Sequence, residues 1–169
     1  MRVLLVGGGC RGLDLTRLLV ADGHAVRLVT RDEGRRAEIE AAGAECWIGT
    51  PDVIGTLRYG LENVTLLLWL LGTAAGDAEK VSALHGSRLR MMLEKTTDTT
   101  VRGVIYEGSG SVRPEVLAQG REEMAHAQRT NEIPYETLTA DPRGDRDVWL
   151  ADVLGAIDRL LAGPRRVAA

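Results

Sequence analysis

Apolar positions along the chain form short continuous runs that alternate with longer stretches of mixed polarity. A short apolar run bounded by turn residues is typical of a buried parallel strand, because helices cover both faces of such a sheet. By this criterion we expect strands at residues 2–6, 25–29, 45–48, 64–71, 101–106 and 135–139.

The stretches between these runs carry apolar residues at the three- and four-residue spacing of amphipathic helices. Leu15 and Leu19 share one face of the first stretch, and Gly23 provides a C-terminal stop. Pro114 falls in the first turn of another stretch, where its missing amide hydrogen costs nothing. We expect helices at 13–21, 35–42, 78–96 (interrupted by Gly86), 114–130 and 148–162, with a weakly helical segment at 52–59.

The alternation of strands and helices predicts an α/β fold. Helical segments of this length between strands imply right-handed crossovers, and therefore a doubly wound, mostly parallel sheet of six strands in a three-layer α/β/α arrangement. A length of 169 residues with 44% hydrophobic content suits one domain. We expect that domain at residues 1–162, followed by a short C-terminal tail at 163–169.

A glycine-rich turn joins the first strand to the first helix. Gly7, Gly9 and Gly12 form the pattern G-x-G-x-x-G, with Cys10 and Arg11 inside it. The first glycine permits a tight turn, the second lets the backbone approach a pyrophosphate, and the third allows close helix–strand packing. Free amides at the helix N-terminus stabilise phosphate. Strand, turn, helix and second strand at this spacing predict a Rossmann fold that binds an NAD-type cofactor, although a turn that serves packing alone would look the same.

The end of the second strand distinguishes the two cofactors. Sites selective for NAD usually have Asp or Glu there, whereas this chain has Thr30 and Arg31. Arg31 can bind a 2'-phosphate through two hydrogen bonds, with Arg11 approaching from the other side. We therefore expect NADP in preference to NAD. Two alternatives stay open: Arg31 only solvates a helix start, or a register slip makes Asp32 the partner of the ribose.

Several segments resemble the short-chain dehydrogenase/reductase superfamily in its atypical and extended branches. The glycine turn is the specific one, and the later motifs are loose. The matching segments are GGGCRG at 7–12, GHAV at 23–26, TR at 30–31, AAGAE at 41–45, LHGSRL at 84–89, MLE at 92–94, VIYEGS at 104–109 and IPYETL at 133–138.

The resemblance implies site residues. The expected cofactor-binding set is Gly7, Gly9, Cys10, Arg11, Gly12, Thr30, Arg31, Thr50, Gly72 and Thr73. Ser109 falls where the family has the serine that hydrogen-bonds a substrate, so it is the expected catalytic residue; ordinary turn chemistry in the sequence GSGS is the alternative.

The family's Tyr-x-x-x-Lys pair is missing, because no tyrosine of this chain is followed by lysine four residues later. Leu117 and Arg121 fall near those positions, and Leu117 cannot transfer a proton. The usual alcohol–ketone mechanism then requires Tyr106 or a substrate group. Extended members continue with a substrate subdomain where this chain ends, so we expect any substrate to be small.

Charge and composition narrow the class of protein. A formal net charge of -3 gives no positive field for a nucleic acid backbone. The longest apolar run has about eight residues, whereas a membrane span needs about twenty. No signal-peptide pattern is seen, so we expect a cytoplasmic protein without membrane or nucleic acid partners. Cys10 and Cys46 show no metal-ligand or disulfide spacing, which indicates structural thiols and no metal.

Assembly and function follow as expectations. The helices at 78–96 and 114–130 could pair across a two-fold axis into a homodimer, with an apolar stripe of Leu84, Leu89, Met92 and Leu93, although these residues could instead face the sheet. The leading functional hypothesis is an NAD(P)-dependent oxidoreductase of the atypical short-chain type, with the acceptor near Thr73, Ser109 and Gly110. A non-catalytic cofactor sensor is the alternative, and a structural subunit is a third reading.

Overall fold

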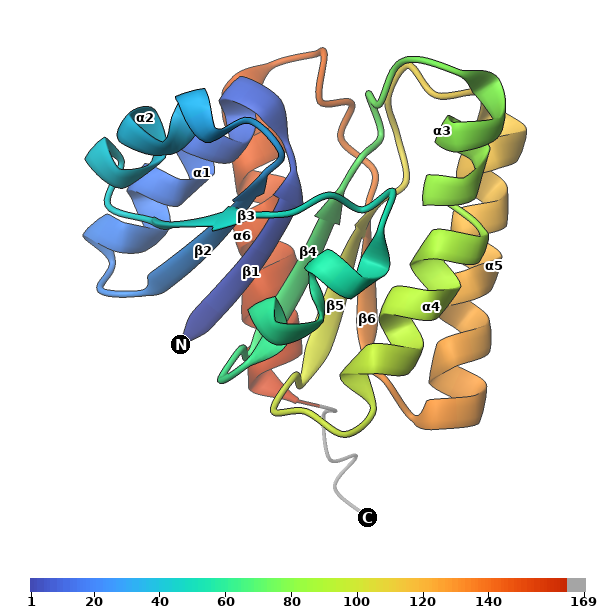
Figure 1. Cartoon of the computed structure of the whole chain (residues 1–169). Helices are drawn as coiled ribbons and strands as arrows, with labels where there is room; N and C mark the ends of the chain where they lie inside the picture. The colour runs from blue at the N-terminus through green and yellow to red at the C-terminus, as the bar shows by residue number, and fades with distance from the viewer. Residues whose placement is uncertain (164–169) are drawn as a thin grey trace.

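The computed structural model describes residues 1–163 and contains a sheet of six parallel strands (Figure 1). Along the sheet the order is β3-β2-β1-β4-β5-β6, and every neighbouring pair is parallel, which confirms the predicted doubly wound α/β class. Except for Gly163, the predicted tail lies outside the described residues. The strands are β1 (Arg2–Gly7), β2 (Ala25–Thr30), β3 (Glu45–Ile48), β4 (Leu66–Leu70), β5 (Gly103–Glu107) and β6 (Tyr135–Leu138).

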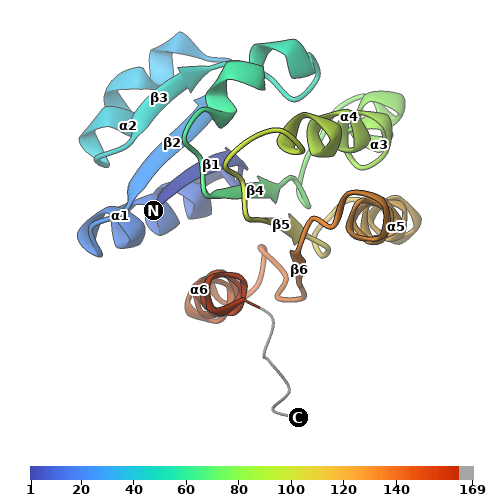
Figure 2. The same cartoon turned by 90° about the horizontal axis from the view of Figure 1, so that it is seen from below.

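Helices cover both faces of the sheet (Figure 2). One apolar cluster joins α1, α2 and α6 to one face, and a second joins α4, α5 and two short 3-10 turns to the other. The helices are α1 (Gly9–Ala21), α2 (Arg36–Ala41), α3 (Ala78–Leu84), α4 (Ser87–Thr96), α5 (Pro114–Asn131) and α6 (Arg146–Ala162), and the 3-10 turns are η1 (Glu33–Arg35), η2 (Ile54–Thr56) and η3 (Arg58–Leu61).

Several boundaries differ from the sequence expectation for local reasons. The helix expected at 78–96 is two helices, and the backbone between them bends at Gly86, where a Cβ would come within 2.6 Å of the Gln119 side chain. The last helix begins two residues earlier than expected, because the Asp145 carboxylate accepts hydrogen bonds from the backbone amides of Asp147 and Val148. The weakly helical segment at 52–59 consists of the turns η2 and η3.

The apolar stripe proposed for a helix-bundle dimer is inside the protomer. Its four residues, Leu84, Leu89, Met92 and Leu93, have exposed fractions between 0% and 8%. The last three lie on α4 and pack against the sheet. These side chains are therefore unavailable for a partner. The expectation that they form an intersubunit stripe is wrong, because the second face of the sheet needs them as its cover.

The order of the strands creates a crevice. From β1 the chain winds outward through β2 and β3, and it then crosses back to place β4 on the other side of β1 (Figure 1). The connections that follow β1 and β4 run in opposite directions, which opens a crevice at the carboxyl ends of these two strands. Open α/β sheets bind ligands at this position. Within residues 1–163, no helix combines the length and apolar character that crossing a bilayer requires.

Candidate dinucleotide-binding site

The glycine turn adopts a backbone that side chains disfavour. Gly7, Gly8 and Gly9 have φ angles of 87°, 84° and 51°, all in the left-handed region. The Gly8 amide donates a hydrogen bond to the Leu70 carbonyl at 2.8 Å, which ties the turn to the end of β4. The turn therefore brings the chain from β1 into α1 beside the crevice.

The glycines of the motif serve two different purposes. A Cβ at Gly7 would lie 2.2 Å from the Leu70 carbonyl oxygen, and one at Gly12 would lie 3.0 Å from the Gly7 carbonyl oxygen. Both positions need glycine for packing. A Cβ at Gly9 would meet nothing within 4 Å, so this residue borders open space at the N-terminus of α1. That space beside free amides fits the pyrophosphate of a dinucleotide.

A cleft of about 540 Å³ runs along the carboxyl ends of the first four strands. Its walls come from the ends of β1 and β2, the segment after β3, the segment after β4 and one side of α3. Thr30, Arg31 and Thr50, three of the residues predicted to bind the cofactor, all line it. Gly7, the first glycine of the turn, also lines it. Its position, at the carboxyl ends of the strands, is where open α/β sheets bind ligands.

Charged side chains of both signs lie at the β2 side of the cleft. Arg31 is 81% exposed and makes a long ion pair, 3.8 Å, with Asp52. The Asp32 carboxylate accepts a hydrogen bond from the Gly34 amide at 2.8 Å and so caps the turn η1. Arg35 and Lys80 line the same cleft. Arg31 and Asp32 both line the cleft, and the Gly34 amide uses only one oxygen of the Asp32 carboxylate.

Arg11 points away from β2. Its Nη2 donates to the Gly144 carbonyl in the connection from β6 to α6, and its Nη1 is buried without a hydrogen-bond partner among the described residues. Because β6 and β2 lie on opposite sides of β1 in the sheet, Arg11 does not approach the Arg31 side chain. The sequence expectation placed it there, and the structure assigns it to the other half of the crevice.

Gly72 is a packing residue beneath the loop that follows β5. It is buried, and a Cβ on it would lie 2.0 Å from the Ser109 carbonyl oxygen. Thr73 next to it is exposed, and Ser109 is half-buried. The loops after β4 and β5 therefore pack backbone to backbone, which fixes the position of Ser109 at the carboxyl edge of the sheet.

Sequence reasoning missed Glu107, the last residue of β5. It is 1% exposed; one carboxylate oxygen accepts from the Gly72 amide at 2.8 Å, and the other accepts from Trp149 Nε1 at 2.9 Å. Burial raises the pKa of this carboxyl group, and the hydrogen bonds from Gly72 and Trp149 oppose that shift. Glu107 thus joins the β4 loop to α6. A carboxylate at the end of an apolar strand was the available signal.

Tyr106 cannot replace the missing tyrosine of the family. Its side chain is fully buried, and its hydroxyl lies 2.7 Å from His85 Nδ1. His85 Nε2 lies 3.1 Å from the Leu71 carbonyl, to which it must donate, so Nδ1 accepts from Tyr106. Burial lowers the pKa of His85 to about 4 and raises that of Tyr106. The imidazole is therefore neutral at pH 7 and packs in the protein interior.

The residues at the family's Tyr and Lys positions have other contacts. Leu117 is buried in a small apolar cluster, and Arg121 donates to the Gly108 carbonyl at 3.0 Å. Cys10 is an exposed free thiol, and Cys46 is a half-buried one. The part of the chain that the structure describes holds no group of three or more His, Cys, Asp or Glu residues arranged around a metal.

Solved structures with this fold are numerous, whereas no family model and no curated protein matches the sequence. A short-chain dehydrogenase/reductase superfamily protein from Agrobacterium tumefaciens, with bound NAD, matches with a TM-score of 0.65 and 17% identity over 81% of this chain and 48% of its own. The UDP-glucuronic acid 4-epimerase of Bacillus cereus, in complex with NAD, has a TM-score of 0.67 and 15% identity, covering 83% of this chain and 57% of its own.

A third similar structure is the triphenylmethane reductase of Citrobacter sp., complexed with NADP(H), with a TM-score of 0.60 and 21% identity over 82% of this chain and 48% of its own. The present chain thus spans about half the length of these structures. The likeness shows that the chain has the Rossmann fold of short-chain dehydrogenase/reductase structures.

Proposed function

We propose that this protein binds NADP on its glycine turn and acts as an oxidoreductase on a small substrate. The observation that carries the proposal is the open space at Gly9, where a Cβ would touch nothing, at the N-terminus of α1. Gly7, in the same turn, lines the cleft at the carboxyl ends of the strands. In the similar structures, the named ligands are NAD and NADP(H). Gly9 and the α1 amides would hold the pyrophosphate.

The β2 side of the cleft supports NADP in preference to NAD. Arg31 is exposed just after β2, and its one ion pair within residues 1–163 is a long one, so a 2'-phosphate can displace Asp52 from it. Thr30 carries no charge to repel that phosphate. Asp32, the alternative partner for a ribose hydroxyl, already accepts from the Gly34 amide through one carboxylate oxygen, whereas the Arg31 guanidinium has no hydrogen bond within residues 1–163.

A bound nicotinamide would supply or accept a hydride at the carboxyl edge of the sheet. Ser109 would orient a substrate carbonyl or hydroxyl by hydrogen bonding. Tyr106 is sealed in the interior and Leu117 has no proton to exchange, so neither provides acid or base. We therefore propose a substrate for which the proton that accompanies hydride transfer comes from, or goes to, water or one of the substrate's own groups.

A second function, that of a non-catalytic NADP sensor, is favoured by the absence of an acid or base from Tyr106 and Leu117. Catalysis by the usual mechanism requires a proton-transferring tyrosine near Ser109, whereas binding of the cofactor does not. In this case the nucleotide would change the affinity of the protein for a partner by stabilising one arrangement of the loops at the crevice.

Thermal unfolding with each dinucleotide, followed by an activity assay, tests the proposal. Ligand at about one hundred times its Kd stabilises a fold by roughly 2.7 kcal/mol, which in a chain of this size raises Tm by about 5 to 10 degrees. NADPH oxidation is then measured with small aldehydes, ketones and quinones. A Tm unchanged by every dinucleotide would remove the cofactor from this site. Binding without turnover of any acceptor would favour the sensor.

A further inference from the structure

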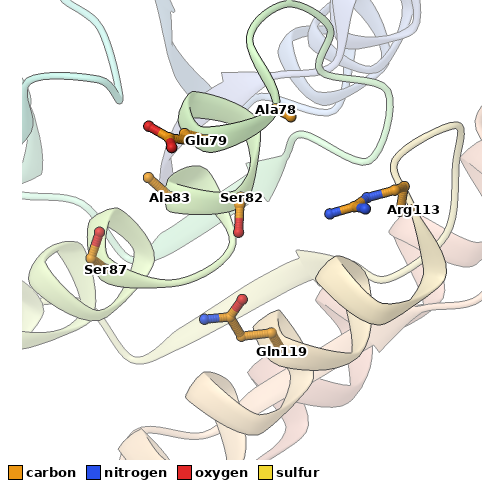
Figure 3. A pocket seen from close by; sticks show the side chains of 7 residues that line it. All are labelled: Ala78, Glu79, Ser82, Ala83, Ser87, Arg113 and Gln119. Carbon is orange, nitrogen blue, oxygen red and sulfur yellow. The ribbon is translucent and has the colours of Figure 1, made fainter.

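A second cavity, of about 460 Å³, lies among α3, α4 and α5 (Figure 3). Its polar lining comes from three helices: Ser82 on α3, Ser87 on α4, and Arg113 and Gln119 at the start and on the second turn of α5. Glu79 and two alanines complete it. None of these residues belongs to the cleft along the strand ends.

Helix α3 separates the two spaces. Lys80, Val81 and Leu84 line the strand-end cleft, whereas Ala78, Ser82 and Ala83 line the second cavity. A small apolar cluster at the first turns of α5 packs against Val81 and closes the region between α3 and α5. The second cavity is therefore a distinct site on the other side of one short helix.

Of the five polar side chains that line this cavity, those of Arg113, Ser82 and Gln119 face the same gap. In Figure 3 the Arg113 guanidinium extends from the start of α5 toward Ser82, and the Gln119 amide points into the same gap. The Glu79 carboxylate lies on the far side of α3 from Arg113. The cavity thus presents one guanidinium, two serine hydroxyls and one amide, and Glu79 is the one carboxylate among its lining residues.

Arg113 is positioned for a ligand and weakly engaged within the chain. Its backbone is fixed, because Pro114 follows it and its carbonyl accepts the Val116 amide at 3.0 Å. Its side chain is 68% exposed, and its ion pair with Glu115 spans 3.5 Å. A planar guanidinium binds a carboxylate through two parallel hydrogen bonds, a geometry that this long pair does not provide.

We propose that this cavity binds a small organic carboxylate that carries a hydroxyl or amide group. The Arg113 guanidinium holds the carboxylate, and the Ser82 hydroxyl and Gln119 amide hydrogen-bond the neighbouring polar group. The assignment depends on the second cavity alone, and it holds whether or not a dinucleotide binds at the glycine turn.

Calorimetric titration of the whole chain with L-lactate, L-malate, L-glutamate and L-glutamine tests this site. Lactamide, which keeps the hydroxyl of lactate but lacks the charge, and inorganic phosphate are titrated in parallel. We expect at least one carboxylate to bind saturably. Arg113→Gln should weaken it about ten- to hundredfold, which is the effect of one charge-assisted hydrogen-bonded pair. Ser82→Ala should weaken it about two- to tenfold.

Arg129→Gln is the matched control, because Arg129 is an exposed arginine in the last turn of the same helix. It should leave carboxylate affinity unchanged. Circular dichroism establishes that each variant is folded, and Ser82→Ala tests the cavity independently if Arg113→Gln is not. Failure of every carboxylate to bind, unchanged affinity in both cavity variants, lactamide binding as tightly as lactate, or saturable binding of phosphate alone would overturn the assignment.

Discussion

A substitution at Gly9 tests binding with less effect on packing than one at Gly7 or Gly12, because a Cβ at Gly9 would meet no other atom within 4 Å. We expect Gly9→Val to abolish dinucleotide binding while the chain still folds. The valine side chain would occupy the volume that the pyrophosphate needs. Titration of the folded variant with NADP measures the effect, and affinity equal to that of the parent would exclude the glycine turn from the site.

Gly23→Val is the matched control for that experiment. Gly23 also has a positive φ, 81°, and a Cβ on it would also meet nothing within 4 Å, but it follows the other end of α1. Both variants therefore carry a similar backbone strain. Gly23→Val should lose stability and keep NADP affinity, so a loss of binding in both would point to strain in α1.

Arg31 is the residue on which the choice of cofactor depends. We expect the parent to bind NADP about ten- to hundredfold more tightly than NAD, and Arg31→Ala to lose most of this preference, because the charge-assisted contact to the 2'-phosphate disappears. Thermal shifts with equal concentrations of the two dinucleotides measure it. Arg17→Ala, an exposed arginine on α1, should change neither shift.

An Arg31→Ala variant that kept the NADP preference would show that Arg31 only solvates the end of β2. Arg35, which lines the same cleft, would then be the next residue to replace. Arg11 is a weaker candidate than its sequence position indicated, because its guanidinium binds the Gly144 carbonyl near β6.

Helix α5 approaches strand β5 through Gly120. A Cβ there would lie 1.9 Å from the Tyr106 hydroxyl oxygen. We expect Gly120→Ala to lower the free energy of unfolding by about 1 to 3 kcal/mol, because the added methyl group overpacks a closed interface. Gly155→Ala on α6, whose Cβ would meet only the flexible end of Arg159 at 3.3 Å, should be neutral or raise it by up to about 1 kcal/mol.

Denaturant titrations of both alanine variants compare these two helical glycines directly. Equal stability of Gly120→Ala and the parent would mean that α5 can move away from the sheet without loss. The buried Tyr106–His85 contact would then be less restrictive than the geometry indicates.

His85 makes the junction between α3 and α4 sensitive to acid. Its pKa is lowered from 6.5 to about 4 in the folded chain, so between these values the unfolded chain binds more protons than the folded one. Stability from this group therefore falls as pH drops from 6.5 toward 4. Between pH 7 and pH 5 we expect it to contribute a loss of about 2 kcal/mol.

His85→Gln removes this titration, and its free energy of unfolding should depend less on pH by that amount. Denaturant titrations at both pH values measure the difference between parent and variant, which cancels the opposite contribution of Glu107, whose raised pKa favours the folded chain as pH falls. His126→Gln, on the exposed side of α5, is the control. Parallel pH profiles for the parent and His85→Gln would contradict the prediction.

For the whole molecule, homodimer formation through α4 and α5 stays a prediction, and its contacts must differ from the buried stripe. Met91, 39% exposed, is the large apolar side chain that α4 presents outward. If these helices pair, Met91→Glu should convert the dimer to a monomer in light scattering, because it places a charge in the interface. Leu18→Glu on α1, where Leu18 is 38% exposed, should not. A parent that is monomeric at high concentration would exclude the dimer.

The periodicity of the sequence determined the order of elements and the class of the fold. Strand and helix positions follow from local apolar spacing, so the six strands were predicted within two residues at every boundary. The sequence indicated an interruption at Gly86, but it did not predict that the segment divides into two separate helices. That division depends on Gln119 of α5, a helix that lies later in the chain.

The sequence by itself also predicted the glycine turn, Thr30, Arg31 and Thr50 as cofactor-binding residues, and this role stays a prediction. The structure places the last three on one cleft, because strand ends of a parallel sheet meet at one edge. Tertiary structure alone decided the direction of Arg11, the burial of Glu107 against Trp149, and the sealing of Tyr106 by His85. Those contacts join residues up to 133 positions apart. Local patterns carry no information about them, since crossing helices and strand order set which distant side chains meet.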